Sequence, residues 1–278
     1  MKHVLISLCL MASPMVLTAQ SPNRFDVNKD NKVDISDIVA VINYMATGKD
    51  SFVTRSYTVN GVQFQMVVVE GGTFLMGSEA STDEKPIHGV KLNSFSIGQT
   101  EVTQELWQAV MGTNPSNWKG AKLPVENVSL DDCYNFIRKL NSLTGQKFRL
   151  PTEAEWEFAA HGGNYSMGYT YSGSNDVATV AWYTSNSGNK THQVATKAPN
   201  ELGIYDMSGN LDEWCEDYYA LDYYSSSGLY NPTGPTTGPG KVNRGGNWGG
   251  TANRCRVTYR YCNKFFSPDN FTGLRLAL

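Results

Sequence analysis

The 278-residue sequence predicts a mixed α+β fold with little regular secondary structure. Two observations indicate this class. Aromatic residues make up 12% of the chain and glycines number 26, whereas long apolar segments with a helical or strand period are few. The periodic segments that do occur are short, and some have a strand period while others have a helical one. Such a composition is typical of a loop-rich domain with a core of tryptophan and tyrosine.

The strand-like segments lie in the first half of the chain. Residues 62–69 alternate and then become wholly apolar, and residues 73–76 resume the apolar pattern after a turn at Glu70-Gly-Gly72. This arrangement predicts a buried hairpin. A further strand is predicted over residues 90–97.

Three short helices are predicted from their caps and apolar stripes. A hydroxyl or carboxylate residue precedes each stripe, and a glycine follows it. The expected N-cap residues are Thr103, Ser129 with Asp132, and Thr152 with Glu155, and the expected terminating glycines are Gly112, Gly145 and Gly162.

Residues 1–20 have the layout of a secretory signal peptide. A Lys-His start is followed by an apolar run from Val4 to Leu17 and by the small residues Thr18-Ala19. We expect cleavage near Gln20 and an exported protein that is periplasmic, displayed on the cell surface or secreted. No later stretch approaches the length of a membrane span.

The charge of the mature chain argues against nucleic acid as a partner. Without Lys2, 22 basic residues face 26 acidic ones, a net charge of −4, and no run of lysine or arginine occurs. The expected organisation is a signal peptide over 1–20, a calcium-binding segment over 21–50, and a main domain over 51–278.

The segment 26–37 has the spacing of a twelve-residue calcium loop. Its oxygen-bearing side chains fall at loop positions one, three, five, nine and twelve, and position seven contributes a main-chain carbonyl. The loop resembles one repeat of a dockerin and is followed by a helical stripe over 38–45. The alternative is a solvated acidic loop, and a single copy argues against docking onto a cohesin-like scaffold. The six expected ligand positions are Asp26, Asn28, Asp30, Lys32, Asp34 and Asp37.

The segment from Asn200 to Cys215 gathers carboxylates, amides and glycines in one short run. Asp206-Met-Ser-Gly209 favours a turn, after which Leu211 and Glu213 share one face of an extended segment. Oxygen atoms of these four residues could converge on a calcium ion. From spacing alone the alternative is favoured, in which Asp206 caps its turn, Gly209 supplies backbone freedom and Glu213 is a solvated strand residue.

Several ordered motifs resemble the formylglycine-generating enzyme family, also called sulfatase-modifying factors. They cover the chain from about Val62 to its last residue. The motifs are Met66-Val-Val-Val-Glu-Gly-Gly-Thr-Phe-Leu-Met-Gly-Ser78, Glu101-Val-Thr103, Pro124-Val-Glu-Asn-Val-Ser129, Arg149-Leu-Pro-Thr-Glu-Ala-Glu-Trp-Glu157, Gly203-Ile-Tyr-Asp-Met-Ser-Gly-Asn-Leu-Asp-Glu-Trp214 and Arg244-Gly-Gly-Asn-Trp-Gly-Gly250.

The resemblance has two implications for structure. It implies a fold related to the C-type-lectin-like arrangement. It also implies a structural calcium ion held by Asp206 and Glu213, with main-chain carbonyls of Gly209 and Leu211.

The resemblance also locates the family's chemistry. Family oxidases convert a cysteine of a Cys-x-Pro-x-Arg segment with dioxygen, using copper on two cysteines five residues apart. The second cysteine matches Cys255, but the first falls on Gly250, so we do not expect copper binding. Asn247 and Asp212 stand where the family has serine and tryptophan, so the substrate groove is also altered.

Three functional classes follow from these motifs. The first is a calcium-stabilised member that binds a protein or glycan ligand, or serves structure, without oxidase activity. The second is an active oxidase with a one-cysteine site, in which Cys255 is catalytic. The third is an assembly module docked through the loop at 26–37.

Four cysteines remain after cleavage, and they allow three disulfide connectivities. One hypothesis is a Cys215–Cys255 bond linking the calcium segment to the closing motif, with Cys133 and Cys262 free or paired. No zinc-type spacing of cysteine or histidine occurs, so no zinc site is predicted.

Overall fold

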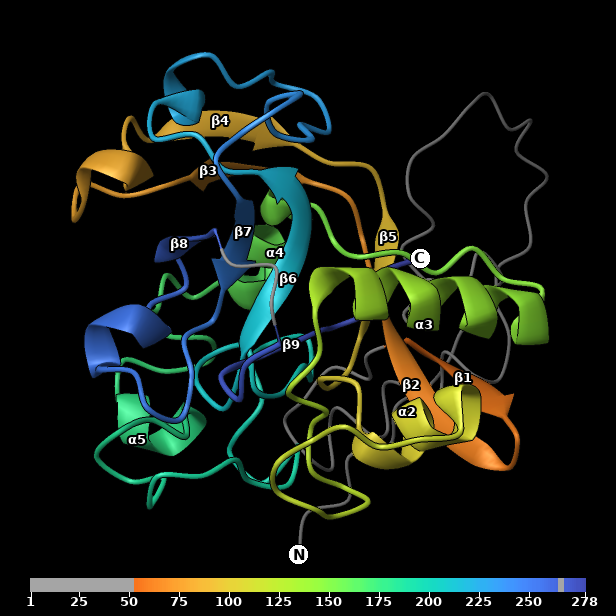
Figure 1. The fold of residues 1–278 in the computed structure, drawn as a ribbon. Coiled ribbons are helices and arrows are strands. Elements are labelled where there is room, and N and C mark those ends of the chain that lie inside the picture. Colours follow the sequence, from red (N-terminus) through yellow and green to blue (C-terminus); the bar gives the residue numbers. More distant parts are fainter. Residues whose placement is uncertain (1–52, 265–267) are drawn as a thin grey trace, which may run out of the picture. The chain divides into compact units, whose positions relative to one another are not determined.

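The computed structural model describes residues 53–264 and 268–278 (Figure 1). The predicted signal peptide and the calcium loop at 26–37 lie outside these residues. Helix accounts for about 22% and strand for about 23% of the structure, in agreement with the predicted mixed class of low regular content. Over the described ranges, every helix is too short or too polar to cross a membrane.

Three small sheets organise the described part of the domain. The first joins β1 (Thr54–Val59), β2 (Val62–Val69) and β5 (Phe95–Gly98) in the order β1-β2-β5. The second pairs β3 (Thr73–Met76) with β4 (His88–Lys91). The third has the order β8-β7-β6-β9 and comprises β6 (Asp212–Tyr218), β7 (Lys241–Arg244), β8 (Arg260–Asn263) and β9 (Thr272–Gly273). All pairs are antiparallel except β6 with β9.

The predicted hairpin of 62–69 with 73–76 is wrong, although both strands exist. β2 pairs instead with β1 across the two-residue turn Asn60-Gly61, where both residues have positive φ, 46° and 82°. That turn geometry matches the twist of a hairpin, so it closes the nearer pair. The predicted strand over 90–97 is likewise two strands, β4 and β5, which belong to different sheets.

The three predicted helices are confirmed as α2 (Gln104–Met111), α3 (Leu130–Thr144) and α4 (Glu153–Ala160). Thr103 caps α2, and α3 and α4 both begin with a complete capping box. Gly112 and Gly145 end their helices in the left-handed conformation, whereas His161 takes the C-cap position of α4. The shorter elements are α5 (Val177–Val180), η1 (Thr82–Glu84), η2 (Gly163–Tyr165), η3 (Tyr223–Ser225) and η4 (Ala252–Cys255).

Two apolar clusters form the core. One surrounds α4, and α4 supplies Trp156 and Phe158 to it. The other packs α2 and α3 against β1 and β2, and the rings of Trp107 and Phe136 stack there with centroids 4.8 Å apart. Trp214 of β6 belongs to this second cluster, while its neighbour Cys215 belongs to the first, so β6 separates the two.

The glutamates of α4 anchor a buried network of charges. Both oxygens of Glu153 accept hydrogen bonds from Arg260, each at 2.7 Å, and Glu157 accepts one from Arg244. All four side chains are almost completely buried. The motif that contains these glutamates therefore contributes to the core.

Asp217 of β6 faces the same network and gives stability a specific pH dependence. Burial, and then the charge of Glu153, raise the pKa of Asp217 to about 8. A raised carboxyl pKa stabilises the fold at low pH, and this contribution is lost as the pH rises from about 4 to about 8. We expect the free energy of unfolding to fall between pH 6 and pH 9, and to fall less in Asp217→Asn. Urea titrations of both proteins at the two pH values measure this, and equal slopes would contradict it.

Candidate functional site

The turn that precedes β6 has an unusual backbone. Asp206, Gly209 and Asn210 all adopt positive φ, at 59°, 81° and 65°. The turn is held by main-chain hydrogen bonds from Gly209 N to Gly245 O and from Asn210 N to Trp182 O, each 2.8 Å long. Asp206 and Glu213 are both buried, so Glu213 is not the solvated strand residue of the alternative interpretation.

The two predicted carboxylate ligands have fixed positions. Oδ2 of Asp206 accepts a hydrogen bond from Ala195 N at 2.7 Å. Glu213 accepts from the Arg275 guanidinium through both oxygens, and its Oε2 also accepts from Trp156 Nε1 at 2.7 Å. A carboxylate oxygen has two lone pairs, so Asp206 keeps capacity for a further partner, whereas each oxygen of Glu213 already accepts two hydrogen bonds.

Glu101, on the loop between β5 and α2, is a third buried carboxylate of this site. Its Oε1 accepts from Leu211 N at 3.0 Å and its Oε2 from Asn210 Nδ2 at 2.6 Å. Burial, and then the charges of Asp206 and Glu213, raise the pKa of Glu101 well above its usual range. Burial likewise raises the pKa of Asp206 to about 6. Sequence reasoning gave Glu101 no role, because it lies 110 residues from Leu211.

The site therefore holds more carboxyl groups than guanidinium groups. Glu101, Asp206 and Glu213 lie within electrostatic range of one another and of a single guanidinium, that of Arg275. If all three carboxyls ionise, the local charge is that of a divalent anion. A divalent cation would neutralise it, and the donors are the hard oxygen atoms that calcium prefers.

Two of the four predicted calcium ligands are side chains. Across the described ranges, no group of three or more His, Cys, Asp or Glu side chains is arranged to hold a metal ion. The predicted calcium site needs no such group, because Gly209 and Leu211 would contribute main-chain carbonyls.

The segment that matches the family's cysteines has one thiol. Cys255 ends η4 and is buried, and its Sγ lies 3.7 Å from Thr251 O. Burial, and then the charge of Asp212, raise the pKa of this thiol to about 12, so it is protonated at neutral pH. Asp212 is itself buried and accepts a hydrogen bond from Asn247. The two residues that replace the family's tryptophan and serine thus contact each other.

The hypothesis of a Cys215–Cys255 disulfide is wrong, because Cys133, Cys215, Cys255 and Cys262 are all free. Cys215 packs in the apolar cluster around α4, whereas Cys255 lies at the end of η4.

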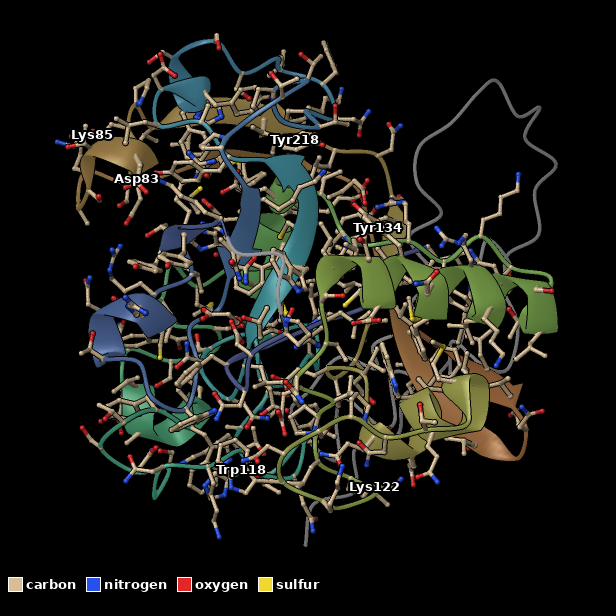
Figure 2. The ribbon with its side chains drawn as sticks, viewed as in Figure 1. Asp83, Lys85, Trp118, Lys122, Tyr134 and Tyr218 are labelled. Atoms are coloured by element: carbon tan, nitrogen blue, oxygen red, sulfur yellow. The ribbon has the colours of Figure 1, made fainter. Side chains whose placement is uncertain are left out.

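Aromatic side chains form a surface next to Gly249 and Gly250, which we call the Trp248 face. It comprises Trp118, Trp248 and Phe271. Trp248 stacks on Phe271 at 4.6 Å and meets Trp118 edge-on at 5.1 Å. Phe271 is 38% exposed. Figure 2 shows Trp118 at the same end of the domain as Lys122, opposite Asp83 and Lys85.

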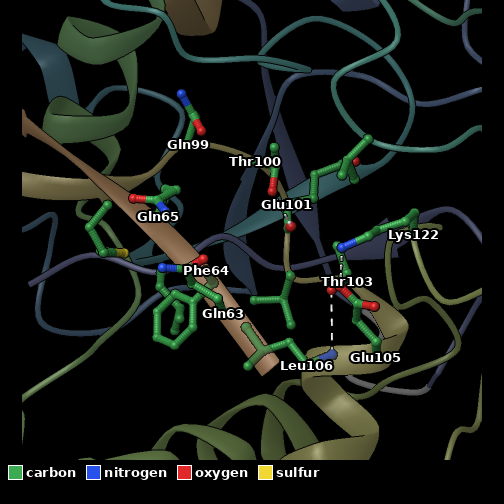
Figure 3. A pocket seen from close by; sticks show the side chains of 15 residues that line it. Gln63, Phe64, Gln65, Gln99, Thr100, Glu101, Thr103, Glu105, Leu106 and Lys122 are labelled. Atoms are coloured by element: carbon green, nitrogen blue, oxygen red, sulfur yellow. Dashed lines mark hydrogen bonds and ion pairs between the residues drawn. The ribbon is translucent and has the colours of Figure 1, made fainter. Parts of the chain in front are cut away.

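The described surface has cavities at two places of interest. One, of about 200 Å³, is lined by Glu101 and by residues of β2 and α2, and Figure 3 shows it with Lys122 and Glu105 at its side. The other, of about 600 Å³, lies between the 92–95 loop, the start of α4 and the loop at 231–233. Neither was predicted from the sequence, since each is built from segments far apart in the chain.

Comparison with known proteins gives the family. The model of the sulfatase-modifying factor enzyme 1-like domain matches residues 57–278. The chain belongs to this family. It is 33% identical over 268 residues to the chaperone protein LppX of Paenibacillus barcinonensis, covering 78% of this chain and 90% of that protein. It is 28% identical over 278 residues to the formylglycine-generating enzyme of Streptomyces coelicolor, covering 74% and 86%.

A solved structure supports the fold of this sulfatase-modifying-factor domain. Treponema denticola variable protein 1 superposes with a TM-score of 0.76 at 36% sequence identity, over 82% of this chain and 99% of that one. The motifs that suggested the family therefore lie in a domain whose fold the family shares.

Proposed function

We propose that this protein is an exported, calcium-stabilised member of the family that binds a ligand without oxidising it. The observation that carries the proposal is the single thiol. Gly250 offers no sulfur, and Cys255 is buried with a raised pKa. Copper(I) in the family's site needs two soft thiolates, so the oxidase reaction has no metal to support it here.

The Trp248 face is the proposed ligand surface. Trp248 is buried beneath the exposed ring of Phe271, and such stacked aromatic rings with one exposed edge suit the apolar side of a peptide or glycan. We also propose that the domain is related to C-type lectin-like folds, in which loops on a rigid scaffold hold the ligand.

An oxidation assay tests the absence of oxidase activity. We expect no aldehyde when the full chain is incubated with a Cys-x-Pro-x-Arg peptide, copper and dioxygen, because one buried thiol cannot form the two-sulfur copper site. Mass spectrometry of the peptide measures the product. An active two-cysteine member of the family, assayed in parallel, is the positive control. Aldehyde formation by this chain would establish the oxidase alternative instead.

We expect two calcium ions per chain, one at the Asp206–Glu213 site and one in the loop at 26–37. Elemental analysis after gel filtration measures the ratio. Asp26→Ala with Asp30→Ala removes carboxylates of the loop, and Asp206→Asn with Glu213→Gln removes those of the family site, so each pair of substitutions is expected to lower the ratio from two to one. A calcium ratio that a pair of substitutions leaves unchanged would count against the corresponding site.

Binding of a cohesin-type partner to the loop at 26–37 would support the assembly-module alternative.

Export is tested by the N-terminus of the mature protein. We propose that it begins close to residue 21, after cleavage near Gln20, and N-terminal sequencing of the protein outside the cytoplasm measures this. An intact Met1 in that fraction would contradict the proposal.

A further inference from the structure

We propose that Glu101 is a positioning residue of the calcium site, holding the turn at 209–211 so that its carbonyls face the ion. This inference rests on the proposed calcium site. Its basis is the pair of hydrogen bonds that Glu101 accepts, one from Leu211 N and one from the side chain of Asn210. Both donors lie on the segment that runs between the two expected carbonyl ligands, Gly209 and Leu211.

The contacts around the Asn210–Leu211 peptide explain how Glu101 acts. This peptide is planar, and it is bonded on both sides: Asn210 O accepts from Trp248 N at 2.9 Å, and Leu211 N donates to Glu101 at 3.0 Å. Fixing its plane restricts the rotation of the two peptides that flank it. Without Glu101, the Leu211 N–H would lose its acceptor in a buried position.

The backbone of the turn needs such support. Asn210 is held at a φ of 65°, a left-handed conformation that asparagine adopts with the help of hydrogen bonds from its side chain. The Asn210 side chain donates to Glu101 and also to His192 O at 3.3 Å. Glu101 thus acts on the conformation of the turn from a distant segment, as partners of metal ligands do in other sites.

The cavity of Figure 3 supplies a matched control. Glu105 lines the same cavity as Glu101, but it pairs with Lys122. Replacing either glutamate by glutamine exchanges one carboxyl group of the cavity wall for an amide. Only the change at Glu101 places an amide against the donors of the 209–211 turn.

The experiment is a calcium titration by calorimetry on the full chain, with Asp26→Ala and Asp30→Ala present so that only one site is observed. We expect Glu101→Gln to weaken calcium binding about tenfold or more, and Glu105→Gln to leave it within about twofold. Equal affinity of Glu101→Gln and its parent would overturn the inference. An absence of binding in the parent itself would instead overturn the proposed calcium site.

A second measurement separates positioning from a general structural role. We expect Glu101→Gln to lower the thermal midpoint more in saturating calcium than in a chelator, because part of its effect acts through bound calcium. If the variant does not fold, Glu101→Asp, which keeps the charge but shortens the reach, is expected to show the same difference. An equal loss of midpoint with and without calcium would overturn the inference.

Discussion

Glu157→Gln is expected to lower the free energy of unfolding by about 3–5 kcal/mol, the range for breaking a buried ion pair. Glu157 is fully buried, and it accepts hydrogen bonds from Arg244 and from Gly77 N. Glutamine is neutral, so the substitution leaves the buried guanidinium of Arg244 with only the carboxylate of Glu153, 3.7 Å away, which already pairs with Arg260. Urea denaturation at pH 7 measures the effect.

The same ion pair predicts how acid acts on the protein. Burial alone would raise the pKa of Glu157, but the charge of Arg244 and the hydrogen bond with His161 outweigh it and lower the pKa to about 2. A lowered carboxyl pKa stabilises the fold above about pH 4.5, and this contribution is lost as the pH falls toward 2.

The control for Glu157→Gln at pH 7 is Glu79→Gln, because Glu79 forms an exposed ion pair with Lys85. We expect that change to cost at most about 0.5 kcal/mol, and similar losses in the two variants would refute the prediction.

Gly209→Ala is expected to cost more than about 3 kcal/mol and to abolish calcium binding at the adjacent site. Gly209 has a φ of 81°, and a Cβ atom there would lie 2.4 Å from Trp182 O and 2.8 Å from Trp182 N. Both neighbours are main-chain atoms, so the clash can be relieved only by moving the turn that holds Asp206 and Asn210.

Gly112→Ala is the matched control for this prediction. Gly112 has nearly the same φ, 85°, but no atom lies within 4 Å of a Cβ built there. The control therefore measures the cost of the left-handed backbone alone, about 1 kcal/mol. Differential scanning calorimetry with and without calcium compares the two variants. Equal destabilisation would show that the close approach to Trp182 is unimportant.

Features decided by neighbouring residues could be predicted from the sequence. The caps of α2, α3 and α4 depend on hydrogen bonds between residues three apart, so the sequence locates these helices. The turn at 206–209 and the alternation that follows it are also local, so the sequence could place Asp206 and Gly209 on one turn and Glu213 on the extended segment after it.

Features decided by distant residues could not be predicted. β3 pairs with β4, the next strand along the chain, and not with β2, and only the folded chain shows which of the two neighbours it joins. The parallel pair of β6 with β9 joins Asp212 to Thr272. The partners of the site were missed for the same reason: Glu213 meets Arg275 62 residues away, and Glu101 contacts a turn more than 100 residues further along the chain.

The buried arginines also constrain the order in which the protein can form. Arg244, Arg256 and Arg260 meet carboxylates that precede them by 87, 172 and 107 residues. During synthesis, the N-terminal part of the domain therefore emerges with Glu84, Glu153 and Glu157 lacking these arginine partners. Stable packing around α4 has to wait for the final quarter of the chain, so folding is expected to be slow and largely post-translational.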